Sequence, residues 1–134
     1  MSGFRLEHTP VHLGLGATCV PLPPMDGPAW YERYGAAHAA DGVEGRLVSM
    51  YTFERDWGTW EMHPSGSELV LVVSGRMTLI QRRAGEDVRT VLGPGEAAIN
   101  PPGVWHTAAV GEPTTAVFIT AGAGTENAPT PPPA

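Results

Sequence analysis

The apolar positions of this chain fall into short runs from about residue 46 onward, and turn residues follow each run. Several runs are rich in β-branched residues and are bounded by Gly, Pro or Asp, which is typical of β-strands. The expected strands cover residues 46–54, 58–63, 68–75, 76–83, 88–92, 104–110 and 114–120. The run at 114–120 consists almost entirely of strand formers, so we expect it to be buried on both faces. Short strands that recur roughly every 8–12 residues predict an all-β sandwich or a closed barrel.

Residues 26–40 show a different pattern, which predicts a short helix. Asp26 is available as a helix cap, and Pro28 stands near the first helical position. Gly35 weakens the helix, so one or two turns are expected. The last residues are rich in proline, which predicts a disordered or polyproline-like tail. The chain therefore divides into an N-terminal extension with a short helix and strands able to form a dimer (1–45), a β-barrel (46–122) and a disordered Pro-rich tail (123–134).

Composition narrows the class of protein. The 134 residues are enough for one domain, and the 17 glycines and 14 prolines along them support many short elements joined by tight turns. The net charge of −6, without a basic run, argues against a nucleic-acid partner. We see no run of the roughly 20 apolar residues that span a bilayer, and no signal peptide. The expectation is a cytoplasmic protein with neither nucleic acid nor a membrane as partner.

Two imidazoles and two carboxylates are expected to meet on neighbouring strands. If residues 58–63 form a strand, Glu61 and His63 point to the same face, because side chains two apart do so. A short loop then leads to Glu68 at the start of the next strand, and "PPGVWH" places His106 at the start of another. Such a set is typical of the ligands of a divalent first-row metal ion.

The spacing of these residues resembles that of the cupin superfamily. The first cupin motif usually contains His, any residue, His, three or four residues, Glu, six residues and Gly; its positions are taken here by Glu61, His63, Glu68 and Gly75. The second motif is matched by Gly95, Pro101, Gly103 and His106. The resemblance implies an all-β double-stranded β-helix, or jelly-roll barrel, here preceded by the short helix. It also implies a homodimer that forms through edge strands or N-terminal segments.

Three positions depart from the cupin pattern. Glu61 stands in place of the first histidine, Arg55 in place of a glycine and Val110 in place of the closing asparagine. The last two concern turns and strand ends, so the fold is expected to survive them. Glu61 bears on function, because a carboxylate adds a negative charge and a hard oxygen donor.

The resemblance implies that Glu61, His63, Glu68 and His106 are metal ligands. With both carboxylates bound they would neutralise a divalent ion, and mixed nitrogen and oxygen ligation favours iron or manganese, with zinc and nickel as alternatives. We therefore expect a metal-binding cupin that acts on a small organic molecule, as an Fe(II)- or Mn(II)-type oxygenase or as a metal-dependent isomerase or lyase. Glu61 is expected to be the fourth ligand or a catalytic general base.

Other readings of the same residues stay open. The chain could be a non-catalytic module that binds a small molecule, or a metal-free enzyme in which carboxylates and imidazoles form an acid–base pair, as in cupin-like sugar epimerases. Glu61 could instead pair with an arginine such as Arg55. Trp57, Trp60 and Trp105 are expected to be packing residues. His8, His12 and His38 are expected to be surface or local structural residues without ligand partners. Cys19 is expected to be a small buried apolar residue.

Overall fold

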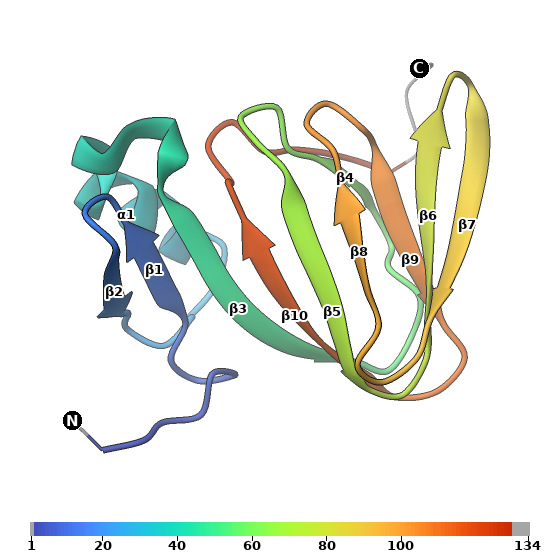
Figure 1. Ribbon diagram of the computed structural model, residues 1–134, viewed down its shortest axis with the longest axis horizontal. Coiled ribbons are helices and arrows are strands. Elements are labelled where there is room, and N and C mark those ends of the chain that lie inside the picture. Colours follow the sequence, from blue (N-terminus) through green and yellow to red (C-terminus); the bar gives the residue numbers. More distant parts are fainter. Residues whose placement is uncertain (1, 130–134) are drawn as a thin grey trace.

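Two antiparallel β-sheets face each other in the computed structural model, which describes residues 2–129 (Figure 1). The six-stranded sheet has the order β2-β1-β3-β10-β5-β8, and the five-stranded sheet has the order β11-β4-β9-β6-β7. The strands are β1 (Val11–Gly14), β2 (Thr18–Pro21), β3 (Arg46–Phe53), β4 (Trp60–Met62), β5 (Glu68–Ser74), β6 (Met77–Arg83), β7 (Glu86–Leu92), β8 (Ala97–Asn100), β9 (His106–Val110), β10 (Thr114–Thr120) and β11 (Glu126–Ala128). The expected all-β jelly roll with a short N-terminal helix is confirmed.

The core lies between the two sheets. Alternate residues of β5 and β6 point inward, and Val70, Val72 and Met77 are completely buried. Each such side chain contributes roughly 1.5–3 kcal/mol of hydrophobic stabilisation. The same alternation holds in β10, where Val117 and Ile119 are only half-buried. The expectation that residues 114–120 are buried on both faces is therefore wrong, because no layer of the described chain fully covers the outer face of this sheet.

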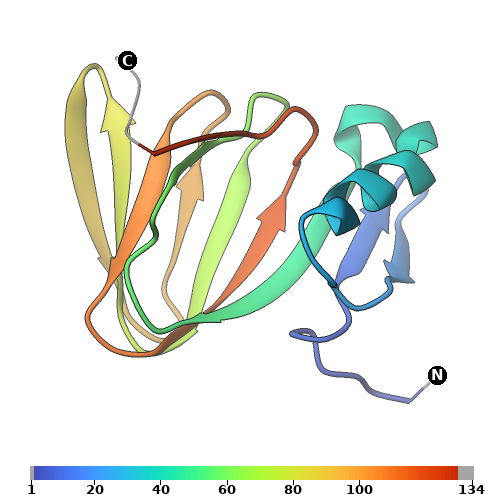
Figure 2. The ribbon, with the colours of Figure 1, turned by 180° about the vertical axis from the view of Figure 1, so that it is seen from behind.

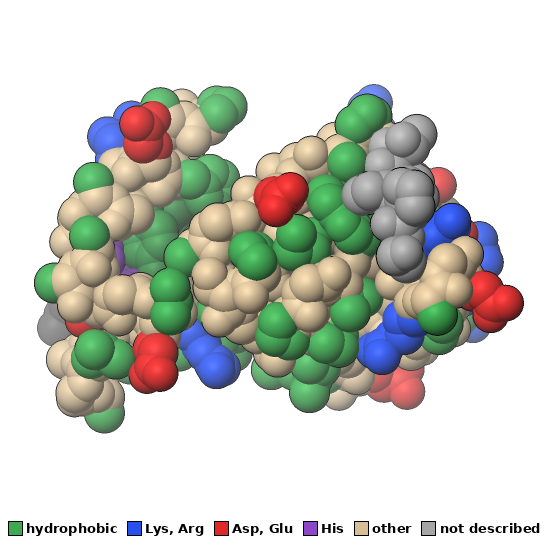
Figure 3. All heavy atoms as spheres, turned by 90° about the horizontal axis from the view of Figure 1, so that it is seen from above, with side chains coloured by type: hydrophobic (Ala, Val, Ile, Leu, Met, Phe, Trp, Pro, Cys, Tyr) green, Lys and Arg blue, Asp and Glu red, His purple; other side chains and the backbone are tan. Residues whose placement is uncertain are grey.

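The N-terminal extension forms a unit at one side of the two sheets. Strand β1 pairs with β3, so the β1–β2 hairpin continues the six-stranded sheet. Helix α1 (Ala29–Ala37) and the 3-10 helix η1 (Ala39–Glu44) lie against one face of this hairpin (Figure 2). Trp30 of α1 is buried with Leu22 and Leu47. Seen from above, a hollow lined by hydrophobic side chains separates this unit from the rest of the molecule (Figure 3).

The helix begins and ends differently from the prediction. Its nine residues exceed the expected one or two turns, since the buried Trp30 anchors it to the hairpin. The N-cap position is held by Pro28, without a side-chain cap. Asp26 lies before the helix and accepts a hydrogen bond from the Arg33 guanidinium, so its contact with the helix is an ion pair. Among residues 2–129, no helix has the length and apolar character needed to cross a membrane.

The chain after residue 122 differs from the expected disordered tail. Glu126–Ala128 forms β11, which pairs with β4 along the edge of the five-stranded sheet. This pairing satisfies backbone groups that β4 would otherwise leave open, and no local sequence pattern reports such a long-range partner. Residues 130–134 of the predicted tail lie outside the described residues.

Cys19 is exposed, so the expectation of a buried apolar residue is wrong. It lies on β2, the edge strand of its sheet, where every residue is exposed. The physical reason is that an edge strand outside the two-sheet core has nothing to bury its side chains.

Candidate metal centre

The four side chains that the sequence predicts as metal ligands lie close together, on strands of both sheets. Glu61 on β4 pairs in register with His106, the first residue of β9. His63 follows β4 directly, and Glu68 opens β5. His63, Glu68 and His106 are buried, while the Glu61 side chain is 32% exposed.

Each of the two carboxylates lies within 4 Å of both imidazoles. Glu68 Oε2 lies 3.2 Å from His63 Nε2, and Glu68 Oε1 lies 3.3 Å from His106 Nε2. Glu61 Oε2 lies 3.8 Å from each of the same two nitrogens. Ligand atoms about 2.1 Å from an ion are about 3.0 Å apart in an octahedron and about 3.4 Å apart in a tetrahedron. The two contacts of Glu68 fall in this range but use different oxygens, and the two contacts of Glu61 are longer. Both carboxylates would therefore have to turn for all four groups to share one ion.

The hydrogen bonds of the two imidazoles leave their Nε2 atoms free. His63 Nδ1 lies 2.8 Å from the Thr125 hydroxyl, which uses its own proton on the carbonyl of Gly122. The His63 ring therefore donates from Nδ1. His106 Nδ1 lies 3.4 Å from the carbonyl oxygen of Val104, which can only accept. In the neutral rings both Nε2 atoms thus carry a lone pair, as metal-ligating histidines require.

Both Nε2 atoms are buried, and neither has a hydrogen-bond partner among residues 2–129. The nearest charged atoms to them are the Glu68 oxygens, at 3.2 Å from His63 Nε2 and 3.3 Å from His106 Nε2. Each nitrogen therefore needs a proton or a cation to offset the loss of its hydration. Here both atoms point at carboxylate oxygens. A cation between them would satisfy all four groups at once.

A chain of amide groups holds Glu68 in place. Asn100 Nδ2 donates to Glu68 Oε1 at 3.0 Å, and the Thr120 hydroxyl donates to Oε2 at 2.6 Å. Gln81 Nε2 donates in turn to Asn100 Oδ1 at 2.8 Å, and Arg83 donates to Gln81 Oε1. Each donor orients the next amide, so both Glu68 oxygens accept from fixed donors and the carboxylate is held in its ionised form.

The electric field of the site favours positive charge. Burial by itself would raise the pKa of the Glu68 carboxyl, but the imidazoles of His106 and His63 outweigh burial and hold that pKa well below its usual range. Burial by itself would lower the pKa of His106, but the carboxylates of Glu61 and Glu68 outweigh burial and raise it to about 9. The Glu68 carboxylate therefore stays ionised here, beside the His106 ring, which attracts either a proton or a metal ion.

The residues present fit a divalent metal ion. Glu61, His63 and His106 can each place one ligand atom within 4.8 Å of the others, and Glu68 contacts both imidazoles. Glu61 faces the imidazoles, and no ion pair between Glu61 and Arg55 is present in the described part of the chain. Two surface hollows, both bordered by Arg76 and Glu112, lie at the other end of β5 and include none of these four residues.

Sequence reasoning missed the groups that support the four candidate ligands: Asn100, Thr120, Gln81 and Thr125. For Trp57, the sequence predicted a packing residue. The Trp57 ring packs on Phe53 and Phe118, yet its centroid lies 6.2 Å from that of His106. Its buried indole nitrogen has no acceptor among residues 2–129. Trp57 is therefore part of the surroundings of the site as well as of the core.

Several solved structures resemble this chain. A solved structure from Klebsiella pneumoniae subsp. pneumoniae MGH 78578, an uncharacterized conserved protein with a double-stranded β-helix domain, is 26% identical with a TM-score of 0.52; the match covers 62% of this chain and 74% of that one. A cupin-2 domain containing protein from Shewanella frigidimarina NCIMB 400 is 23% identical with a TM-score of 0.49, over 56% and 69% of the two chains. Oxalate oxidase in complex with the substrate analogue glycolate is 18% identical with a TM-score of 0.52. This match covers 60% of this chain and 45% of oxalate oxidase.

The comparison with curated proteins found no match. A family model, the cupin domain, matches residues 51–122, which contain all four candidate ligands. That match spans more than half of the chain, and the two-sheet fold agrees with it. The chain therefore belongs to the cupin family.

Proposed function

We propose that this protein binds one divalent metal ion through Glu61, His63, Glu68 and His106 and acts on a small organic molecule at that ion. The observation that carries the proposal is the pair of buried Nε2 atoms, on His63 and His106, that face two carboxylates and lack any other partner in the described chain. A single cation accounts for the charge, the lone pairs and the spacing together.

The donor set favours iron or manganese. Two imidazole nitrogens and two carboxylate oxygens balance the charge of a divalent ion and suit Fe(II) or Mn(II), whereas soft Cu(I) lacks a thiolate or thioether donor here. Zinc and nickel also accept this set. Substitution of the usual first histidine by Glu61 makes the site harder and more negative, and this is the main chemical feature of this chain.

The two carboxylates are suited to different roles. Glu68 is buried and accepts two hydrogen bonds, so it cannot swing and is suited to be a permanent ligand. Glu61 is partly exposed and lies farther from both imidazoles. It can therefore ligate or, turned toward a bound molecule, accept a proton as a general base. Trp57 offers its free indole N–H to an oxygen of the same molecule, and the aromatic rings around it exclude water.

A bound divalent metal supplies a Lewis acid, and iron or manganese adds one-electron chemistry with O₂. The reaction is accordingly an oxygenase reaction or a metal-dependent isomerase or lyase reaction. The chain's part in either is to position the substrate beside Glu61 and to keep the imidazoles and Glu68 fixed.

Elemental analysis tests the metal site. Protein purified without added metal or chelator is expected to contain close to one equivalent of iron, manganese, nickel or zinc in the centre described here, and the His63→Ala and His106→Ala variants are expected to lose it. His8→Ala is the matched control, because His8 is exposed and lies outside the cluster. Wild-type metal content in both core variants would show that the four side chains do not hold the metal.

We also infer that the protein is a homodimer formed through the N-terminal extension. Strand β2 is the outermost strand of its sheet in the described part of the chain, and all four of its residues are exposed. An open edge of this kind pairs readily with a second copy. Sedimentation analysis of wild type and of Cys19→Pro, which removes an N–H that points away from β1, tests the inference; monomeric wild type would refute it.

A further inference from the structure

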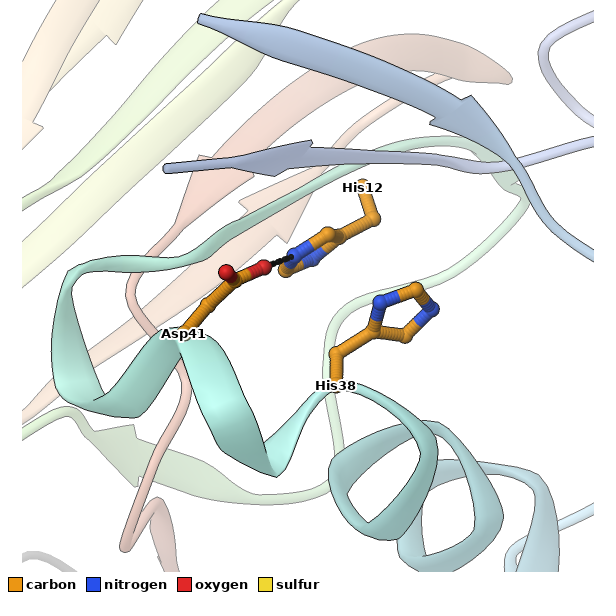
Figure 4. Close-up of side chains that lie close together, drawn as sticks. All are labelled: His12, His38 and Asp41. Carbon is orange, nitrogen blue, oxygen red and sulfur yellow. Dashed lines mark hydrogen bonds and ion pairs between the residues drawn. The ribbon is translucent and has the colours of Figure 1, made fainter. Parts of the chain in front are cut away.

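A second cluster of metal-type ligands lies in the N-terminal unit, outside the family match at residues 51–122. His12 of β1, His38 at the end of α1 and Asp41 of η1 each point toward a common space (Figure 4). His12 Nε2 lies 2.6 Å from Asp41 Oδ2, and the rings of His12 and His38 are stacked with centroids 4.0 Å apart. One ligand atom from each residue lies within 4.8 Å of the other two. The sequence indicated no ligand partner for these histidines, but the fold supplies Asp41.

His12 is arranged as buried metal-ligating histidines usually are. It is only 2% exposed, and its Nδ1 lies 2.6 Å from the hydroxyl oxygen of Tyr34. Tyr34 is itself fixed by stacking on Trp30. A proton on Nδ1, donated to Tyr34, leaves the lone pair of Nε2 beside the Asp41 carboxylate. A proton on Nε2 would instead close a purely structural hydrogen-bond chain from Tyr34 through His12 to Asp41.

Close packing around His12 and Asp41 leaves no room for a side chain at two glycines, Gly14 and Gly45. A Cβ at Gly14 would lie 2.5 Å from Thr18 Oγ1, 2.8 Å from Asp41 Oδ2 and 3.2 Å from His12 Nε2. A Cβ at Gly45 would lie 2.7 Å from His12 Cε1. Gly45 has an ordinary extended backbone (φ −66°, ψ 143°), so its conformation does not require glycine. Glycine at these two positions therefore avoids clashes with Thr18 Oγ1, Asp41 Oδ2 and the His12 ring.

We propose that His12, His38 and Asp41 form a second divalent-metal site, with zinc as the preferred ion, that ties the β1–β2 hairpin to the helical segment. Two imidazoles and one carboxylate are a common three-ligand set for zinc, and water or the Thr18 hydroxyl completes four-coordination. The extension has a small apolar core around Leu22, Trp30 and Leu47, so a metal cross-link between its three segments adds stability that its own packing supplies poorly.

Zinc titration of chelator-stripped protein tests this site separately from the barrel site. Calorimetry is expected to give two equivalents of zinc for wild type and one for His38→Ala, and also one for Asp41→Asn. The His63→Ala/His106→Ala double variant is expected to keep one equivalent, which disappears when His38→Ala is added. His8→Ala is the control and is expected to match wild type. Zinc should also raise the melting temperature of the double variant and slow proteolysis within residues 15–45.

Equal zinc stoichiometry for wild type and His38→Ala would overturn the proposal. So would a double variant that is folded by circular dichroism and binds no zinc. If the double variant does not fold, the comparison of wild type with His38→Ala and Asp41→Asn decides, because these two positions lie outside the two-sheet core. The reverse pattern, one equivalent that depends on His38 and not on His106, would support this site and refute the barrel site.

Discussion

Substitution of Asn100 tests the hydrogen bonds that hold Glu68 in place. It is 1% exposed, donates to Glu68 Oε1 at 3.0 Å and accepts from Gln81 at 2.8 Å. Asn100→Asp keeps the shape of the side chain but turns the donor that faces Glu68 into a second carboxylate oxygen. Two unit charges about 3 Å apart repel by about 5.5 kcal/mol at an effective dielectric constant near 20.

Protonation limits this cost. A carboxyl group with an ordinary pKa of about 3.9 can be kept protonated at pH 7 for about 4 kcal/mol. The positive His106 imidazole, whose pKa is raised to about 9, offsets part of the repulsion, so we expect a loss of about 2–4 kcal/mol at pH 7. The new carboxyl has a raised pKa in the folded state. The loss in free energy of unfolding is therefore absent at pH values below 3.9 and grows as the pH rises toward the pKa of this carboxyl in the folded protein.

Asn100→Leu provides the matched control. It has nearly the same volume and removes one hydrogen bond to a charged group and one to an amide, which costs about 3 kcal/mol without adding a titrating group. Urea unfolding of chelator-treated protein between about pH 5 and pH 8 measures both variants. The loss for Asn100→Asp should increase with pH, while the loss for Asn100→Leu follows the wild-type profile. Parallel profiles for the two variants would refute the assigned contact between Asn100 and Glu68.

Two further predictions concern a turn and a metal-supporting contact. Gly75→Ala is expected to lower the free energy of unfolding by about 3–5 kcal/mol, because Gly75 has a φ of 84° and a Cβ there would lie 2.4 Å from the carbonyl oxygen of Pro113. Gly85→Ala is the control in the same urea assay: Gly85 has a φ of 80°, but a Cβ there would meet nothing within 4 Å, so the loss should be only about 1–2 kcal/mol. Equal losses at the two positions would contradict the steric argument. Thr125→Val removes the partner of His63 Nδ1 and should weaken metal binding about 10-fold in competition with a chromophoric chelator, with little change in folding; unaltered affinity would show that the hydroxyl does not orient the ring.

The candidate ligands of the barrel could be found from the sequence because their signals are local. Strand alternation placed Glu61 and His63 on one face, and motif spacing added Glu68 and His106. The structure brings these four side chains together as the pattern indicated. Their roles as metal ligands stay a prediction.

The supporting residues carry no such signal. Thr125 reaches His63 across 62 positions of sequence, and Thr120 reaches Glu68 across 52. These contacts depend on which strands pair and in which register, and register is a property of the assembled sheets. For the same reason β11 was mistaken for part of a disordered tail, since its three residues become a strand only beside β4.

The sequence by itself determined the β-rich architecture, the position of most strands and the identity of the four barrel residues, because alternation and turn residues act over a few neighbouring positions. Only the tertiary structure decided which nitrogen of each imidazole is free, how Glu68 is held, and that Asp41 meets His12 across 29 positions. These features arise where irregular or distant segments pack together. Their geometry is set by the sum of many weak contacts, so no short stretch of residues can encode it alone.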